Sequence, residues 1–198
     1  MRHTEEQWDK LLQIRSCGRD DSRADEYRYP YEPTPYCVLE RLGNSGLIRR
    51  ENVLLDYGCG KGRVDFFLSY HTGAKAIGIE YDEEIYAQAQ ENRKTAKAKA
   101  DFLLTRAEAY QVPSAVDRCY FFNPFSKEIL HKVMARILES YYETPREILL
   151  CFYYPSEDYL SYLMTVNELE FSQEIPCNDL FQNSDPRERL VIFSLHPF

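Results

Sequence analysis

Three glycines at alternate positions follow an apolar segment in the sequence LLDYGCGKGRV. Gly58, Gly60 and Gly62 have no Cβ atom, so a loop built from them can turn tightly and let a ligand approach the backbone. A dinucleotide fingerprint, G-x-G-x-x-G, would need its third glycine at position 63, where the sequence has Arg63. Asp56 precedes the loop, and a carboxylate there disfavours a diphosphate. The pattern D-x-G-x-G-x-G therefore predicts a ligand site of another kind.

This motif resembles motif I of the class I S-adenosylmethionine-dependent methyltransferases, and the similarity extends in order over residues 53–154. The resemblance implies S-adenosyl-L-methionine as the cofactor. It also implies that Asp56 hydrogen-bonds the amides of the glycine loop, while Cys59 serves as a small spacer within the cofactor-binding loop. An ordinary turn between a strand and a helix is the alternative, but three alternating glycines after an apolar strand disfavour it.

Acidic and aromatic residues after the following strands extend the resemblance. Glu80 ends the second expected strand, 22 residues after Gly58, where the family has an acid that holds both ribose hydroxyls. Tyr81 occupies the position that packs against adenine, and Glu108 is the candidate for a polar contact near the adenine amine. Glu80 by itself could be a solvated carboxylate at a strand end; its combination with the glycine motif favours a cofactor role.

The fourth expected strand is followed directly by Asn123, Pro124 and Phe125. Methyltransferases that act on exocyclic or amide nitrogens carry an Asn/Asp-Pro-Pro-aromatic tetrad here, in which carbonyl groups accept the target N–H bonds and the ring stacks on a planar substrate. This chain has one proline fewer. Asn123 and Phe125 are therefore candidate catalytic residues. The alternative is that Asn123 and Pro124 only end the strand, with Phe125 in the core and Ser126 capping the next helix.

Thr34 and Pro35 precede a helical pattern of apolar residues. Threonine is a good N-cap and proline is favoured at the first helical position, so a helix is expected to begin at this pair. Some amino-methyltransferases have a Thr-Pro pair here that touches the methionine part of the cofactor, which makes Thr34 a candidate cofactor contact. Capping alone also explains the pair. A helix N-terminus beside the cleft would suit the cofactor's carboxylate.

Strands and helices alternate along most of the chain. A capping box at Thr4 and Gln7 begins a first helix, and residues 16–33 lack periodicity and are expected to form a loop or arm. Gly43 is the expected end of the helix that starts at Thr34. Apolar runs predict strands at 53–57, 75–80, 102–105, 116–122, 147–154, 169–175 and 190–196. Helical patterns follow the first five of these strands except the third, at 62–71, 83–98, from Ser126 onward and at 156–166.

This order predicts an α/β fold, a Rossmann-like seven-stranded and mainly parallel sheet with a C-terminal antiparallel strand pair and helices on both faces. A short helical N-terminal extension with an arm or lid is expected over residues 1–50. The methyltransferase domain is expected over residues 51–198.

Composition limits the partners. The chain has 198 residues and a net charge of −8, so bulk charge does not attract it to nucleic acid or to anionic membranes. Six dispersed cysteines without a CxxC pair, together with scattered histidines, predict no metal site. The N-terminus is not a secretory signal, and no apolar run approaches the ~20 residues of a membrane helix, so a cytoplasmic protein without a membrane partner is expected.

The most direct prediction is a methyltransferase whose acceptor is a small molecule, an RNA or a protein; Asn123 slightly favours a nitrogen atom. A cofactor-binding module without catalysis, or the scaffold subunit of a methyltransferase pair, is the alternative. The sequence does not indicate the oligomeric state. Basic patches that could contact RNA are Arg15, Arg19, Arg23 and Arg28, or Arg49, Arg50, Lys61 and Arg63. Aromatic residues expected to border the cleft are Tyr27, Tyr29, Tyr31, Tyr36, Phe121, Phe122 and Phe125.

Overall fold

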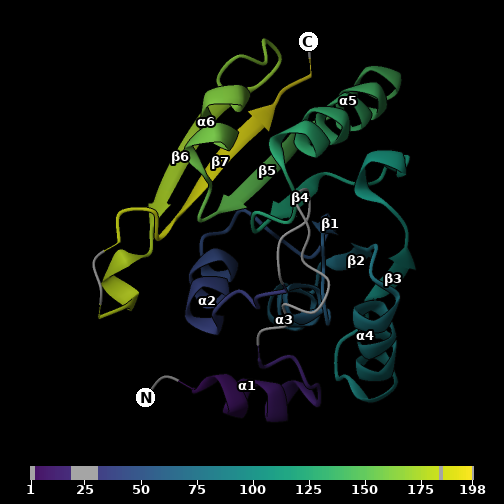
Figure 1. The fold of residues 1–198 in the computed structure, drawn as a ribbon, viewed down its shortest axis with the longest axis vertical. Helices are drawn as coiled ribbons and strands as arrows, with labels where there is room; N and C mark the ends of the chain where they lie inside the picture. Colours follow the sequence, from purple (N-terminus) through teal and green to yellow (C-terminus); the bar gives the residue numbers. More distant parts are fainter. Residues whose placement is uncertain (1–2, 19–30, 183–184, 198) are drawn as a thin grey trace.

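The computed structural model describes residues 3–18, 31–182 and 185–197, and its elements follow the expected alternation (Figure 1). Much of the expected arm, including Tyr27 and Tyr29, therefore lies outside the described residues. The elements in chain order are α1 (Glu5–Leu12), α2 (Tyr36–Asn44), β1 (Val53–Tyr57), α3 (Arg63–Thr72), β2 (Lys75–Glu80), α4 (Glu83–Thr95), β3 (Asp101–Leu104), η1 (Ala107–Ala109), β4 (Arg118–Phe121), α5 (Lys127–Glu143), β5 (Ile148–Tyr153), α6 (Glu157–Leu163), β6 (Glu170–Pro176), η2 (Asn178–Leu180) and β7 (Arg189–Leu195).

One seven-stranded sheet has the order β3-β2-β1-β4-β5-β7-β6. All pairs are parallel except those of β7, which runs antiparallel to both β5 and β6. The predicted fold class is therefore confirmed. Successive strands are added on one side of β1 up to β3 and on its other side from β4 onward, so the strand order reverses between β1 and β4. The carboxyl ends of β1, β2 and β4 lie at one edge of the sheet, where ligands bind in folds of this kind.

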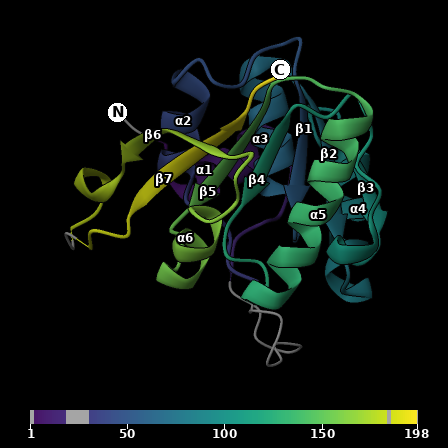
Figure 2. The same cartoon turned by 90° about the horizontal axis from the view of Figure 1, so that it is seen from above.

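Helices cover both faces of the sheet (Figure 2), and an apolar core lies between the helices and the sheet on each face. On one face, α1, α2, α3 and α4 pack through residues that include Leu39 and Phe67. On the other face, α5 and α6 contribute Val133, Ile137 and Leu163, each fully buried. The helix predicted from Ser126 onward is present as α5, and the residues that it buries lie three or four positions apart along one face.

The start of α2 differs from the sequence prediction. Thr34 is not the N-cap: the helix begins at Tyr36 with Pro35 in the capping position, and there is no side-chain cap. The Thr34 hydroxyl instead lies 2.9 Å from the hydroxyl of Tyr120 on β4. Gly43 does not end the helix either, since α2 continues to Asn44. By contrast, the capping box predicted at the start of α1 is present.

The described part of the chain contains no helix of the length and apolar character that spanning a membrane requires. Within the same residues no cluster of three or more His, Cys, Asp or Glu side chains is arranged to hold a metal ion. All six cysteines are free thiols.

Candidate active site

A cleft opens at the carboxyl ends of β1, β2 and β4, with an empty volume of about 960 Å³ that includes its open mouth. Most of the site residues predicted from the sequence lie on its wall. Those that line it are Thr34, Asp56, Gly58, Cys59, Glu80, Tyr81, Glu108 and Phe125. Gly60 and Asn123 lie next to lining residues in the chain, and Gly62 lies two residues before the lining residue Val64, but none of the three lines the cleft itself.

The glycine loop has the left-handed backbone that its sequence suggests, with φ of +74° at Gly58, +56° at Gly60 and +83° at Gly62. A Cβ atom on Gly58 would lie 2.6 Å from Pro124, and one on Gly60 would lie 2.2 Å from the ring of Tyr31. Both distances are shorter than atoms tolerate. The backbone of the loop is therefore in direct contact with the segments that border the cleft, which only glycine allows.

Glu80 is buried at the end of β2, and its carboxylate closes the glycine loop. Its Oε2 atom accepts a hydrogen bond from the amide of Gly60 at 3.0 Å, and its Oε1 atom accepts bonds from the amides of Tyr81 and Asp82. Burial raises the pKa of Glu80, although these three amides act in the opposite direction. Because a carboxylate oxygen accepts two hydrogen bonds, Oε2 has capacity for one donor from a ligand.

Asp56 meets a second carboxyl group that the sequence analysis did not identify. Asp65, on the buried face of α3, lies against Asp56, and both side chains are almost completely buried. Burial raises the pKa of Asp56 to about 7, and burial together with the charge of Asp56 raises the pKa of Asp65 well above its ordinary value. The Oδ2 atom of Asp56 has no hydrogen-bond partner among the described residues. The pair therefore carries fewer than two negative charges near neutral pH.

Cys59 is buried inside the loop. Its side chain packs against Gly78 of β2, where a Cβ atom would lie 2.6 Å away. Burial raises the pKa of the Cys59 thiol well above its ordinary value, so the group is not an activated thiolate.

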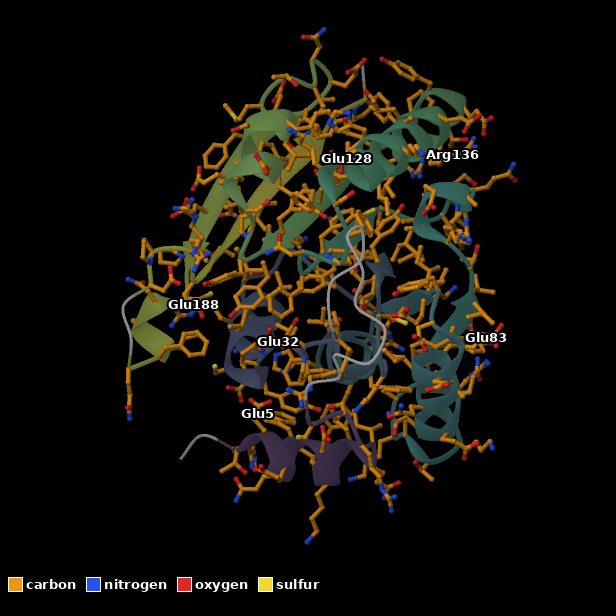
Figure 3. The ribbon with its side chains drawn as sticks, viewed as in Figure 1. Glu5, Glu32, Glu83, Glu128, Arg136 and Glu188 are labelled. Atoms are coloured by element: carbon orange, nitrogen blue, oxygen red, sulfur yellow. The ribbon has the colours of Figure 1, made fainter. Side chains whose placement is uncertain are left out.

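The N-terminal part of the chain forms one wall of the cleft through Tyr31, Glu32 and Thr34. Tyr31 lies on Gly60, and Glu32 is exposed at the surface (Figure 3). Thr34 is buried between β4 and the glycine loop. Sequence reasoning placed Tyr31 in an aromatic group near the cleft but gave no indication of Glu32.

Tyr81 and Glu108 lie on the opposite wall, together with Ile85, Thr105 and Ala107. Glu108 belongs to the short 3-10 helix η1, which follows β3, and its backbone carbonyl accepts a hydrogen bond from Arg136 of α5. Tyr81 is half-buried at the end of β2. This wall combines a ring, small apolar groups and an acid.

Aromatic residues at the end of β4 form the floor of the cleft: Tyr120, Phe122 and Phe125 all line it. Phe125 is also a core residue, because its ring packs edge-on against Tyr57 and Phe121. Phe122 is half-buried, with its ring 4.7 Å from that of Tyr153.

Asn123 connects two loops. Its Nδ2 atom donates to the carbonyl of Tyr154, and its Oδ1 atom accepts from the amide of Ser156 at 3.4 Å. Asn123 and Tyr154 both have left-handed backbones, with φ of +39° and +50°. The side-chain amide thus joins the loop after β4 to the loop after β5.

The described lining of the cleft is acidic and contains no lysine, arginine or histidine. The second basic patch suggested by the sequence does not form. Arg63 is buried, and Arg49 and Arg50 precede β1, at the amino ends of the strands and away from the cleft. Of the first patch, Arg19, Arg23 and Arg28 lie outside the described residues. Acids that line the cleft are Glu32, Asp56, Glu80, Asp82 and Glu108.

Comparison with known proteins agrees with this geometry. A family model described as a methyltransferase domain matches residues 54–143. No curated protein sequence matches the chain. Many solved structures share its fold, and those described below do so at low sequence identity.

An RNA methyltransferase from Salinibacter ruber, crystallised with S-adenosyl-L-homocysteine, is 16% identical, with a TM-score of 0.60 over 83% of this chain and 94% of that one. A TehB-like SAM-dependent methyltransferase from Corynebacterium glutamicum is 20% identical, with a TM-score of 0.58 over 80% of this chain and 86% of that one. A putative class I methyltransferase from Listeria monocytogenes is 14% identical, with a TM-score of 0.62 over 82% and 60% of the two chains.

Proposed function

We propose that the chain is a class I S-adenosylmethionine-dependent methyltransferase, which binds S-adenosyl-L-methionine in the cleft and catalyses methyl transfer to an acceptor. The observation that carries the proposal is the meeting of the glycine loop, Asp56 and Glu80 in one cleft at the carboxyl edge of the sheet. The crystallisation of the Salinibacter enzyme with S-adenosyl-L-homocysteine supports the choice of cofactor.

The residues fit a ligand of this chemistry. The cofactor carries an ammonium and a sulfonium group, and the lining of the cleft offers several acids, Glu80 among them. Glu80 has one acceptor position left for a ribose hydroxyl. The loop of Gly58, Cys59, Gly60 and Gly62 would hold the cofactor by its backbone.

The other proposed cofactor contacts come from residues on the two walls of the cleft. Tyr81 would pack on the adenine ring and Glu108 would contact its amine, as their place on one wall supports. Thr34 would contact the methionine part from the other wall, where the amino end of α2 also lies.

When bound, S-adenosyl-L-methionine supplies an electrophilic methyl group, and transfer breaks the S–CH₃ bond and leaves neutral S-adenosyl-L-homocysteine. The acceptor atom provides the electron pair of the new bond and loses its proton to solvent. The protein contributes mainly by alignment, since this chemistry does not require a strong base. Phe122 and Phe125 would exclude water and face a planar acceptor. Asn123 would act as a positioning residue, because its amide holds the loops on either side of that floor together.

For the acceptor we propose a small planar molecule that is neutral or cationic, in preference to RNA. Nucleic acid is held largely through lysine and arginine contacts to phosphate, and the described lining has neither residue. Aromatic side chains and acids instead favour an uncharged or positively charged ring. The slight preference for a nitrogen acceptor remains part of this proposal.

Calorimetric titration with S-adenosyl-L-homocysteine and with NAD tests the cofactor assignment. We expect the sulfur compound to bind and NAD not to bind. Glu80→Ala should weaken binding of S-adenosyl-L-homocysteine at least about tenfold, because the loop loses its acceptor. Glu83→Ala is the matched control, because this exposed acid on α4 lies three residues away and does not line the cleft (Figure 3). Binding of NAD alone would overturn the proposal.

Transfer of a labelled methyl group into fractionated cell extract tests the reaction. We expect label in the low-molecular-mass fraction, and label in RNA or in protein would refute the proposed acceptor class. Tight binding of S-adenosyl-L-homocysteine with no labelled fraction at all would favour the alternative of a non-catalytic cofactor-binding module or scaffold subunit.

A further inference from the structure

Arg63 is the first residue of α3, directly after the glycine loop, and it is only 2% exposed. Among the described residues, the hydrogen bonds and ion pairs of its guanidinium all go to residues 5–34 of the chain. Nε donates to Ser16 Oγ at 2.7 Å, Nη1 donates to the carbonyl of Thr34 and to Glu5, and Nη2 donates to Cys17 Sγ. One buried cation therefore collects groups from three separate stretches of the N-terminal region.

Asp9 provides a second negative charge in this cluster, 3.9 Å from the guanidinium. It accepts hydrogen bonds from the amide and hydroxyl of Ser16 and from the hydroxyl of Tyr36. Burial opposes its ionisation, but these hydrogen bonds and Arg63 lower its pKa overall. The face of Tyr36 also lies against the guanidinium, 4.3 Å from its carbon. The cation is thus well compensated in a buried place.

The same contacts set the position of a cleft wall. Tyr31, whose ring lies on Gly60, donates its hydroxyl to the carbonyl of Ser16 at 2.7 Å. Thr34, whose carbonyl is held by Arg63, bonds through its hydroxyl to Tyr120 on the floor of the cleft. Removing the guanidinium would therefore loosen Ser16, which holds Tyr31, and would free the carbonyl of Thr34, so both wall residues would lose support.

Helix α1 is attached through the same cluster. Glu5 and Asp9 are residues of α1, and Figure 3 shows Glu5 on the edge of α1 that faces the rest of the fold. Trp8 packs between Tyr36 and Phe67, with ring centroids at 5.8 and 4.9 Å. Trp8 is the only tryptophan of the chain, so its fluorescence reports whether α1 is packed.

We propose that Arg63 is a positioning residue for cofactor binding: it builds the Tyr31–Thr34 wall from the N-terminal region and thereby couples the packing of α1 to cofactor affinity. The inference rests on the proposed function. Coupling between two sites is reciprocal. Loosening α1 must therefore lower the affinity for the cofactor, and binding of the cofactor must in turn favour the packed state of α1.

The test compares Arg63→Lys and Ser16→Ala with Arg118→Lys. Arg118 is a buried arginine at the opposite, amino end of β4, and it bonds to Leu47, Asp117 and Glu147 away from the cleft. Ser16→Ala is the milder change, because it removes one acceptor of Arg63 outside the cleft lining. For each variant, calorimetry measures the affinity for S-adenosyl-L-homocysteine, Trp8 emission reports the packing of α1, and circular dichroism reports folding.

We expect Arg63→Lys to lose at least about tenfold in affinity and to shift Trp8 emission to the red, with a smaller loss in Ser16→Ala. Saturating S-adenosyl-L-homocysteine should return the emission toward that of the wild type, which a purely structural defect would not do. Arg118→Lys should keep both properties. Unchanged affinity in folded Ser16→Ala and Arg63→Lys overturns the inference, as does an equal loss in Arg118→Lys. If Arg63→Lys fails to fold, Ser16→Ala alone decides. Absence of binding by the wild type would instead refute the proposed function.

Discussion

At the scale of single residues, the cleft depends on groups that have little freedom to change. Gly60 has a left-handed backbone and no space for a side chain, because the ring of Tyr31 occupies it. Asp56 and Asp65 share a buried space in which two charges repel each other. Gly60 belongs to the glycine loop and the two aspartates lie beside it, so substitutions at either place should change both protein stability and ligand affinity.

Gly60→Ala should lose affinity for S-adenosyl-L-homocysteine and unfold more easily, since its Cβ would displace Tyr31 and break the bond to Ser16. Gly46→Ala is the matched control: Gly46 also has positive φ, but nothing lies within 4 Å of its Cβ position. That control should cost about 1 kcal/mol in chemical denaturation and leave binding unchanged. Equal effects of the two substitutions would contradict a packed Tyr31–Gly60 contact.

Asp65→Asn should remove a pH dependence of stability. Carboxyl groups with pKa raised in the folded state bind protons that the unfolded state has released, so stability falls as pH rises from about 4 to about 7, the pKa of Asp56. The variant loses the titration of Asp65 and its repulsion by Asp56, so urea unfolding should show a flatter pH profile and a higher stability than the wild type at pH 8. The exposed Asp101→Asn serves as control, and an unchanged wild-type profile in Asp65→Asn would contradict the buried pair.

At the scale of elements, the register of the sheet decides which loops meet. Asp56 pairs with Gly78 and with Tyr120 on the neighbouring strands, which brings the ends of β1, β2 and β4 to one level. The loops after β4 and β5 leave the sheet side by side and are joined through Asn123. This connection lies behind the aromatic floor, so it affects the acceptor side of the cleft more than the cofactor side.

Asn123→Ala should therefore affect binding of the acceptor without affecting binding of the cofactor. It leaves the Tyr154 carbonyl and the Ser156 amide without this partner and places alanine at φ +39°, which together should lower stability by about 2 kcal/mol. Acceptor KM should rise while affinity for S-adenosyl-L-homocysteine stays near the wild-type value. Asn123→Gly relieves the backbone strain but not the lost bonds, and thermal unfolding of the two variants separates these effects. Loss of cofactor affinity in Asn123→Gly would show that the loop reaches the cofactor side.

At the scale of the whole molecule, charge and its placement determine which partners are attracted. The net charge is −8, and the described cleft lining adds local acids instead of a compensating basic surface. Two arginines that could have formed such a surface, Arg63 and Arg118, are buried and paired with acids or carbonyls. Long-range electrostatics therefore repels polyanions from the cleft.

Filter binding with total tRNA at low salt should accordingly detect no complex at micromolar concentrations of the protein. Low salt is the condition most favourable to such a complex, because phosphate contacts strengthen as counterions are diluted. A complex whose affinity falls steeply with added salt would contradict this prediction and would return RNA to the candidate acceptors.

Local sequence patterns determined a large part of this protein. The alternation of apolar strands and amphipathic helices, the glycine loop and the position of Glu80 depend on residues close together in the chain, so periodicity and backbone freedom predict them. The seven strands, their order of appearance and the antiparallel end were all predictable for this reason.

Only the tertiary structure decided which distant groups meet. Thr34 bonds to Tyr120 instead of capping its own helix, Asp65 lies against Asp56, and Asn123 joins two loops. Arg63 is a cation by sequence alone, but packing buries it among groups of the N-terminal region. Contacts between residues far apart in the chain depend on how whole elements pack and on which partner compensates a buried polar group, and neither is encoded in local spacing.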